Sequence, residues 1–316
     1  MTHKLGSAGG CDGESLDGGG ERAKSLAARL AAIHNPIWIT HPHVTPILDR
    51  LDYVYTHPKT HRMPNVLVVG PTGSGKTLVI QRWITRTLAA SKPSNYAIGT
   101  NNCGDVVPAI PVVYTQVPCV PDEGRLYRHI LAGLGAHAIA VTRSRVGDLE
   151  MSALRGLRNA GTRVLVLDEI QDVLCGSTQN QRRLLSAIKH LGNSLQIPIV
   201  ACGTEEAFIA LRTDRALANR FWPMRLMRWK NDDAFRKLLA TFEDTLGLTH
   251  VSNLATPGMS SRILGMTDGT IGEIAQLLKV AAVAAIRSGL ERIDDTVLDS
   301  LNWISPSDRG WDGHAA

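Results

Sequence analysis

A glycine-rich turn between an apolar run and an amphipathic stretch constrains this chain more than any other feature. The turn reads Gly70, Pro71, Thr72, Gly73, Ser74, Gly75, Lys76 and Thr77. It fits the pattern G-x-x-x-x-G-K-[ST], in which glycines let backbone N–H groups surround phosphate oxygens at the start of a helix. In that pattern Lys76 reaches the β- and γ-phosphates of a nucleotide, and the Thr77 hydroxyl binds Mg²⁺. The motif follows a strand and precedes a helix, so it predicts an α/β fold.

Short β-branched runs alternate with amphipathic stretches from Pro64 onward. The expected strands are Val66–Val69, Ile110–Gln116, Val164–Leu167 and Ile197–Ala201. The expected helices between them are Lys76–Ala90, Glu123–Leu134, Gly147–Ala160 and Asn180–Leu195. This alternation is typical of βαβ units, so we expect a mostly parallel sheet with helices on both faces.

Strand patterns are absent after Asp232, where four helical patterns begin. They cover Ala234–Leu246, Thr256–Met266, Ile271–Arg287 and Asp294–Trp303, which predicts an all-helical C-terminal lid domain. Two more helices are expected before the glycine-rich turn, at Glu21–Ile33 and Val44–Tyr55. The predicted division is a flexible tail over 1–20, an N-terminal extension over 21–62, an α/β nucleotide-binding domain over 63–230, the lid over 231–305 and a tail over 306–316.

Two adjacent carboxylates, Asp168 and Glu169, follow the apolar run Val164–Leu167. Open α/β sheets bind their ligands at the carboxyl ends of strands, which places both carboxylates beside the glycine-rich turn. Asp168 is expected to hold Mg²⁺ through water, and Glu169 to orient and polarise the water that attacks a γ-phosphate. The alternative interpretation is an ordinary strand followed by an acidic helix N-cap.

Polar residues also end two other expected strands. Thr204 follows Ile197–Ala201 closely, and its hydroxyl is a candidate catalytic sensor that hydrogen-bonds the γ-phosphate or the attacking water. It is equally suited to begin a helix over Glu205–Leu211, and the sequence leaves both interpretations open. Gln116 is a candidate to hydrogen-bond Glu169 and hold it away from water, although a solvated side chain is the simpler interpretation.

A basic stretch interrupted by aromatic residues precedes the lid. It contains Arg212, Arg215, Arg220, Arg225, Arg228 and Lys230. An arginine supplied by a neighbouring subunit can neutralise charge on a γ-phosphate in the transition state. Arg220 is the first candidate for this catalytic role and Arg215 the second. The alternatives are a patch that contacts nucleic-acid phosphates and a merely solvated face.

Composition narrows the class of protein. Lys and Arg number 34 against 29 Asp and Glu, and the net charge of +5 permits a nucleic-acid partner. Arg143, Arg145 and Lys189 are candidates for phosphate contacts. The five cysteines form no C-x-x-C pair, and no apolar run approaches the ~20 residues of a membrane helix. We therefore expect a cytoplasmic protein without a membrane partner.

The order of these motifs resembles that of the AAA+ ATPases: P-loop, Asp-Glu strand end (the Walker B pattern), polar strand end, and arginine before a helical domain. Within this class the chain resembles the TniB proteins of transposons, relatives of the TnsC regulators, from about His41 to Trp303. The segments that carry the resemblance are His41–Lys59, Pro111–Pro118, Asp122–Gly135, Val164–Val173, Pro198–Glu205 and Asn219–Trp229.

The resemblance implies an ATP-dependent, DNA-binding regulator of transposition with ATP and Mg²⁺ as cofactors. Such a protein assembles as a homo-oligomer, a ring or a filament, on double-stranded target DNA. It recruits or activates a transposase, usually with a transposon accessory protein, and hydrolyses ATP to disassemble.

One position departs from the pattern that the resemblance implies. Glu273 stands where many AAA+ relatives have a lid arginine, called sensor 2, which acts on ATP. Two other functions stay open: a P-loop signalling or scaffold module that acts through protein partners without DNA, and a replication-loader-type ATPase. A loader usually adds a winged-helix domain, and few residues follow Trp303.

Overall fold

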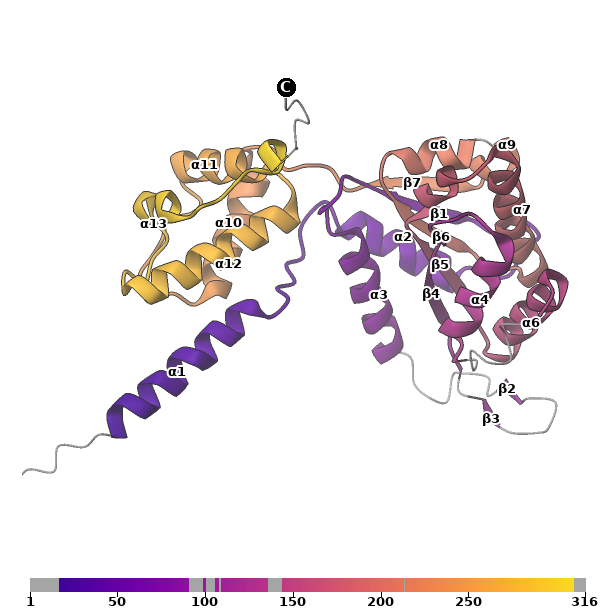
Figure 1. Ribbon diagram of the computed structural model, residues 1–316, viewed down its shortest axis with the longest axis horizontal. Coiled ribbons are helices and arrows are strands. Elements are labelled where there is room, and N and C mark those ends of the chain that lie inside the picture. The colour runs from indigo at the N-terminus through magenta and orange to yellow at the C-terminus, as the bar shows by residue number, and fades with distance from the viewer. Residues whose placement is uncertain are drawn as a thin grey trace, which may run out of the picture.

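The computed structural model describes residues 17–90, 99–100, 106–107, 109–135, 144–212 and 214–309. It contains a sheet with helices on both faces and a separate group of helices (Figure 1). We call these parts the sheet lobe and the helical lobe. The predicted α/β fold class with a helical C-terminal region is confirmed.

The five-stranded sheet is parallel at every pairing and has the order β4-β5-β6-β1-β7. Its strands are β1 (Asn65–Val69), β4 (Val112–Gln116), β5 (Val164–Asp168), β6 (Ile199–Gly203) and β7 (Phe221–Arg225). All residues of β1, β5 and β6 are buried, as expected for central strands of a sheet covered on both faces. A two-stranded antiparallel pair, β2 (Gly99–Thr100) and β3 (Val106–Val107), lies outside this sheet.

Alternating residues of the central strands supply two hydrophobic cores. Val66 and Val68 of β1 pack with α2 (Thr45–Thr56) and α3 (Lys76–Ala90). Leu67 and Val69 pack on the other face of the sheet. The helices of that face are α4 (Glu123–Gly133), α6 (Val146–Asn159), α7 (Thr178–Leu195), α8 (Glu206–Arg212) and α9 (Arg215–Ala218). A 3-10 turn, η2 (Ile170–Cys175), joins β5 to α7.

The helical lobe is built around a core of its own. Its elements are α10 (Asp233–Leu246), α11 (Pro257–Thr267), α12 (Ile271–Ser288), α13 (Asp295–Ser300) and the 3-10 helix η3 (Pro306–Arg309). Helix α1 (Asp17–His34) joins this lobe, because Ile33 is buried in the same core and Arg29 pairs with Glu291 at 2.7 Å.

Most residue bounds lie within two residues of the expected ones, but α1 begins four residues earlier than expected and α13 ends three residues earlier. The strand expected at Ile110–Gln116 begins two residues later, at Val112, directly after Pro111. Strand β7 and the pair β2–β3 were not predicted. Within the described part of the chain, no single helix is long and apolar enough to cross a membrane. Among the described residues, one pair of helices, α11 and α12, bent by 112°, has the length and composition of a broken span.

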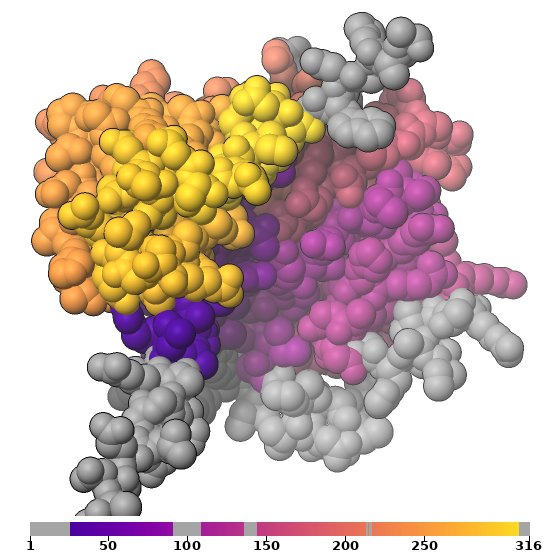
Figure 2. Space-filling view, turned by 60° about the vertical axis from the view of Figure 1, so that its left-hand side comes forward, coloured from indigo at the N-terminus to yellow at the C-terminus, as the bar shows by residue number. Residues whose placement is uncertain are grey.

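The two lobes meet at the glycine-rich turn. The Gly272 N–H, at the start of α12, donates to the Gly73 carbonyl at 2.8 Å. A Cβ at Gly272 would lie 2.7 Å from that oxygen, so the close approach requires glycine. Near this contact, His43 stacks on Trp229, which lies between β7 and α10, and their ring centroids are 4.4 Å apart. Figure 2 shows the lobes side by side, with the helical lobe in orange and yellow and a recess between them.

Candidate nucleotide-binding site

The glycine-rich turn runs from the end of β1 to the first residue of α3, as its motif predicts. Gly73 and Gly75 have φ values of 76° and 83°, which side chains with a Cβ rarely adopt. A Cβ at Gly70 would lie 2.6 Å from the Leu226 carbonyl. Each of these three glycines therefore meets a steric requirement of the loop.

The loop carries a buried cation and a hydroxyl without a partner. Lys76, 8% exposed, donates from Nζ to the carbonyls of Gly70 at 2.9 Å and Pro71 at 3.0 Å. Burial lowers the pKa of Lys76, while the charges of Glu169 and Asp168 raise it. The Ser74 Oγ is buried and has no hydrogen-bond partner among the described residues. A buried ammonium and a free hydroxyl at a helix N-terminus fit a polyphosphate.

Asp168 and Thr77, the two residues predicted to bind Mg²⁺, are in direct contact. The Thr77 hydroxyl donates to Asp168 Oδ2 at 2.8 Å, and Asp168 is only 1% exposed. Tyr114 of β4 donates to the same carboxylate oxygen at 2.6 Å, and the Glu169 N–H donates to Oδ1 at 2.9 Å. Hard oxygen donors of this kind suit Mg²⁺. Tyr114 was missed at the sequence level, because only the sheet order places β4 beside β5.

Glu169 leaves β5 with a left-handed backbone, φ 56° and ψ 44°. Its carboxylate accepts a hydrogen bond from Nε2 of Gln171, in η2. The Oε1 of the same glutamine accepts the Thr204 N–H at 3.1 Å. Of the two interpretations of Gln116, the structure supports the solvated side chain: Gln116 is exposed, and the hydrogen bond to Glu169 comes from Gln171.

Thr204 lies at the end of β6, close to Glu169 through Gln171. Its hydroxyl donates to the Glu206 carboxylate at the start of α8, and its carbonyl accepts the Ala207 N–H at 3.0 Å. These contacts are those of a residue that begins a helix. The sensor role of the Thr204 hydroxyl stays a prediction.

Arg220 lies at the opposite end of the sheet from the glycine-rich turn. Its carbonyl accepts the Asn65 N–H at 3.0 Å, where β1 begins, and its guanidinium donates to Asn193 Oδ1 of α7. The glycine-rich turn begins after Val69, roughly 13 Å away along β1 at about 3.3 Å per residue. Arg220 therefore cannot reach the phosphate site of its own subunit. Arg215 lies in α9, and its side chain is outside the described part of the chain.

Comparisons with known proteins agree with this geometry. The family model described as bacterial TniB protein matches residues 29–231, more than half of the chain. The chain belongs to the TniB family. No curated protein sequence matches it significantly.

The fold of the TniB-family chain is similar to that of several solved structures. The Aeropyrum pernix ORC1 protein in complex with DNA superposes with a TM-score of 0.59 at 19% identity, covering 86% of this chain and 68% of that one. The Aeropyrum pernix ORC2 protein gives 0.57 at 15% identity, covering 84% and 69%. A chain of Drosophila ORC bound to DNA gives 0.56 at 13%, covering 95% and 68%. These likenesses confirm the AAA+ P-loop ATPase fold.

The lid position that departs from the AAA+ pattern is occupied by an ion pair. Glu273, in the first turn of α12, accepts a hydrogen bond at Oε1 from Nη1 of Arg309 in η3, at 2.9 Å, and its Oε2 forms an ion pair with Arg309 Nη2 at 2.8 Å. Arg309 also lies over the Trp303 ring at 5.0 Å. Position 273 therefore carries no cation itself, but the guanidinium of Arg309, 36 residues further along the chain, lies beside it.

A small apolar slot of about 100 Å³ adjoins the glycine-rich turn. Its walls come from the N-terminal segment, the turn itself, α10 and α12; they include Trp38, His41, Gly75, Phe242, Ile271 and Ala275. Burial, and then the nearby His43, lowers the pKa of His41 to about 4, so this imidazole is neutral at physiological pH.

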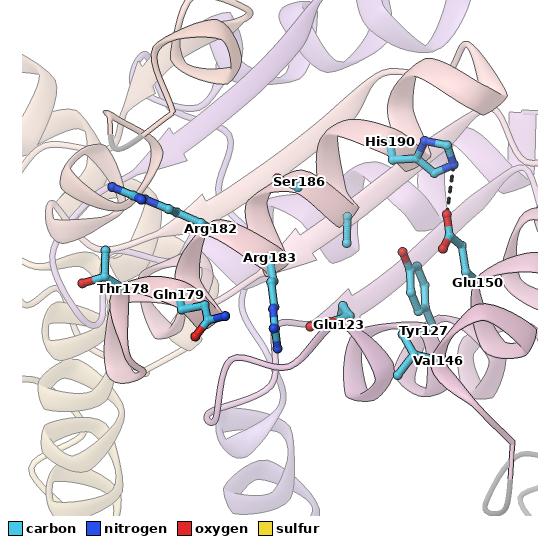
Figure 3. A pocket seen from close by; sticks show the side chains of 11 residues that line it. Glu123, Tyr127, Val146, Glu150, Thr178, Gln179, Arg182, Arg183, Ser186 and His190 are labelled. Carbon is cyan, nitrogen blue, oxygen red and sulfur yellow. Dashed lines mark ion pairs between the residues drawn. The ribbon is translucent and has the colours of Figure 1, made fainter.

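A groove of about 700 Å³ lies elsewhere, between α4, α6 and α7 (Figure 3). Tyr127 and the ion pair between His190 and Glu150, 3.0 Å long, line one end, while Arg182 and Arg183 line the other. None of the predicted site residues within the described ranges lines it, so volume alone does not locate the nucleotide site.

The sequence offers three candidates for contacts with DNA phosphates. Arg143 lies outside the described residues, and Arg145 is exposed at the N-cap of α6. Lys189 pairs with Asp214 at 2.7 Å. Apart from the masked segments, no three His, Cys, Asp or Glu side chains gather closely enough to hold a metal ion.

Proposed function

We propose that this TniB-family chain is an ATP-dependent regulator of DNA transposition. In this proposal it binds ATP and Mg²⁺, assembles as a ring or filament on double-stranded target DNA and recruits or activates a transposase, with a transposon accessory protein. ATP hydrolysis then releases the assembly. The observation that carries the ATPase part is the meeting of Thr77 and Asp168 beside the glycine-rich turn, with Glu169 next to them.

The residues of the site divide the work of hydrolysis. Lys76 leaves the carbonyls of Gly70 and Pro71 and binds the β- and γ-phosphates, while the apolar slot accepts the base. Mg²⁺, held by the phosphates, Thr77 and Asp168, would neutralise charge on the transferred group. Glu169 orients and polarises the attacking water. Arg220 acts on the phosphate site of a neighbouring subunit, since its own site is too distant.

Two substitutions separate ATP binding from hydrolysis. Lys76→Ala removes the one side chain expected on the β- and γ-phosphates and should abolish most ATP binding. Glu169→Gln should keep ATP affinity, measured with a fluorescent analogue, and slow hydrolysis by about 10²–10⁴-fold. Hydrolysis by Glu169→Gln at the wild-type rate would show that another group activates the water.

DNA binding is proposed from family membership and the net charge of +5. Two structural relatives, ORC1 and Drosophila ORC, are bound to DNA in their own structures. Contacts to phosphates alone make binding independent of sequence and sensitive to salt. Binding of this chain should also depend on ATP and be cooperative, because each added subunit packs against the previous one.

The experiment titrates two unrelated duplexes with the full chain at several salt concentrations, with and without a non-hydrolysable ATP analogue. The log of the affinity should fall with the log of salt at a slope of about −0.9 per phosphate neutralised, equally for both duplexes. A preference for one duplex that survives added salt would indicate base readout instead. No binding to either duplex at low salt with the analogue would refute the transposition proposal and favour a scaffold that acts through protein partners.

A further inference from the structure

Gln171 connects two parts of the site that the sequence treats separately. Its Nε2 donates to the Glu169 carboxylate, and its Oε1 accepts the Thr204 N–H at 3.1 Å. Both the N–H group and the oxygen of this carboxamide thus form hydrogen bonds, which fixes the orientation of the carboxamide. The glutamine therefore joins the end of β5 to the end of β6.

The backbone around this contact is shaped to admit the carboxamide. A Cβ at Gly203 would lie 2.3 Å from Gln171 Oε1 and 3.0 Å from the Ala207 Cβ. Only glycine at position 203 leaves that space free. Glu169 itself has φ 56°, a conformation uncommon for residues other than glycine, and it turns the chain so that η2 returns toward its carboxylate.

We propose that Gln171 is a positioning residue for hydrolysis: its carboxamide holds the Glu169 carboxylate in the orientation that activates water and ties it to the end of β6. This inference rests on the proposed role of Glu169 in ATP hydrolysis. With one carboxylate oxygen bonded to Gln171, the side chain of Glu169 loses rotational freedom while its other oxygen stays available to a water. A displacement of about 1 Å in such a group can lower the rate about 100-fold.

Removal of the carboxamide tests the proposal in the full chain. Gln171→Ala should lower kcat about 10–100-fold, leaving KM for ATP and equilibrium ATP affinity within about twofold of wild type. The matched control is Gln181→Ala. Gln181 also uses a carboxamide near η2, donating to the carbonyls of Gly176 at 2.9 Å and Leu174 at 3.2 Å, and it does not contact Glu169. Equal kcat losses in the two variants would assign a structural role to Gln171 and overturn the inference.

Gly203→Ala tests the same contact of the Gln171 carboxamide by a change in β6. The added methyl group displaces the Gln171 carboxamide, so kcat should fall about as far as in Gln171→Ala. The double variant should be no slower than Gly203→Ala alone, because both changes break one contact. Multiplied losses in the double variant would mean that the two residues act independently. If the wild-type chain hydrolyses no ATP, the proposed function fails. If the wild-type chain hydrolyses ATP and Gln171→Ala does so at the same rate, only the inference about Gln171 fails.

Discussion

Tyr114 provides a quantitative test of how the carboxylate beside the glycine-rich turn is held. Its phenol donates to Asp168 Oδ2 at 2.6 Å, and Asp168 is 1% exposed. Burial, followed by the hydrogen bond to Asp168, raises the pKa of Tyr114, so the phenol stays protonated and remains a donor at neutral pH. A hydrogen bond to a charged group contributes about 1.5–3 kcal/mol. Tyr114→Phe keeps the ring and should lower the free energy of unfolding by that amount.

Urea titration measures this loss, and Tyr53→Phe is the control. The Tyr53 side chain is 48% exposed and contacts its neighbours through its ring, so removal of its hydroxyl should change the unfolding free energy by less than about 0.5 kcal/mol. The reasoning is refuted if Tyr114→Phe is as stable as Tyr53→Phe.

The same variant also tests the proposed Mg²⁺ site. Asp168 Oδ2 accepts hydrogen bonds from both the Thr77 and the Tyr114 hydroxyl. In the proposed site Thr77 would bind Mg²⁺ and would no longer donate to Asp168. Tyr114 then remains the side-chain donor that orients the carboxylate. Loss of such a supporting hydrogen bond costs about 10–100-fold in metal affinity or activity. The Mg²⁺ concentration for half-maximal ATPase activity should rise accordingly, and an unchanged value would contradict the assignment of Asp168.

Two further predictions address the subunit interface and the helical lobe. Arg220→Ala should lose ATPase activity while keeping nucleotide affinity, and mixing it with Glu169→Gln subunits should restore part of the rate. No recovery at any ratio, with co-assembly verified, would exclude action between subunits. Hydrogen bonds from Arg29 hold the pKa of Glu291 at about 2 against an ordinary 4.5. The stability this pair adds is therefore complete above pH 4.5 and lost as the pH falls toward 2. Arg29→Ala should make the stability less dependent on acid pH. Far-UV circular dichroism during acid unfolding measures this dependence, and a profile unchanged from wild type would contradict the contribution of the pair.

The sequence predicts the glycine-rich turn and the Asp-Glu strand end well because each motif is local. The residue spacing within each motif indicates strand, turn and helix without reference to distant residues. Strand β7 is different: Phe221–Arg225 contains Pro223, which lacks a backbone N–H and argues against a central strand. The sheet tolerates it because β7 is an edge strand that pairs on one side only, with β1.

The partner of Glu169 shows where local reasoning fails. Gln116 is a candidate partner of Glu169 from its position at a strand end, and the structure does place it opposite Asp168 in the register of β4 and β5. The chain, however, turns left-handed at Glu169, which no residue preference predicts for a glutamate. That single backbone angle brings Gln171 back to the carboxylate and leaves Gln116 in solvent. Similarly, the pairing of Glu273 with Arg309 depends on how the chain end folds across α12.

Several polar groups of the site are hydrogen-bonded to one another. Lys76 is bonded to Gly70 and Pro71, Thr77 to Asp168, and the Gly73 carbonyl to the Gly272 N–H of the helical lobe. Binding of a triphosphate must exchange the first two sets of hydrogen bonds for bonds to phosphate and metal, so their loss reduces the net affinity. The third bond joins the turn directly to the lobe that carries η3. A Cβ at Gly272 would lie 2.7 Å from the Gly73 carbonyl oxygen, and Gly73 has φ 76°, so both positions of this contact favour glycine. Because the contact is direct, we expect a rearrangement of the turn on ATP binding to change the relative position of the lobes.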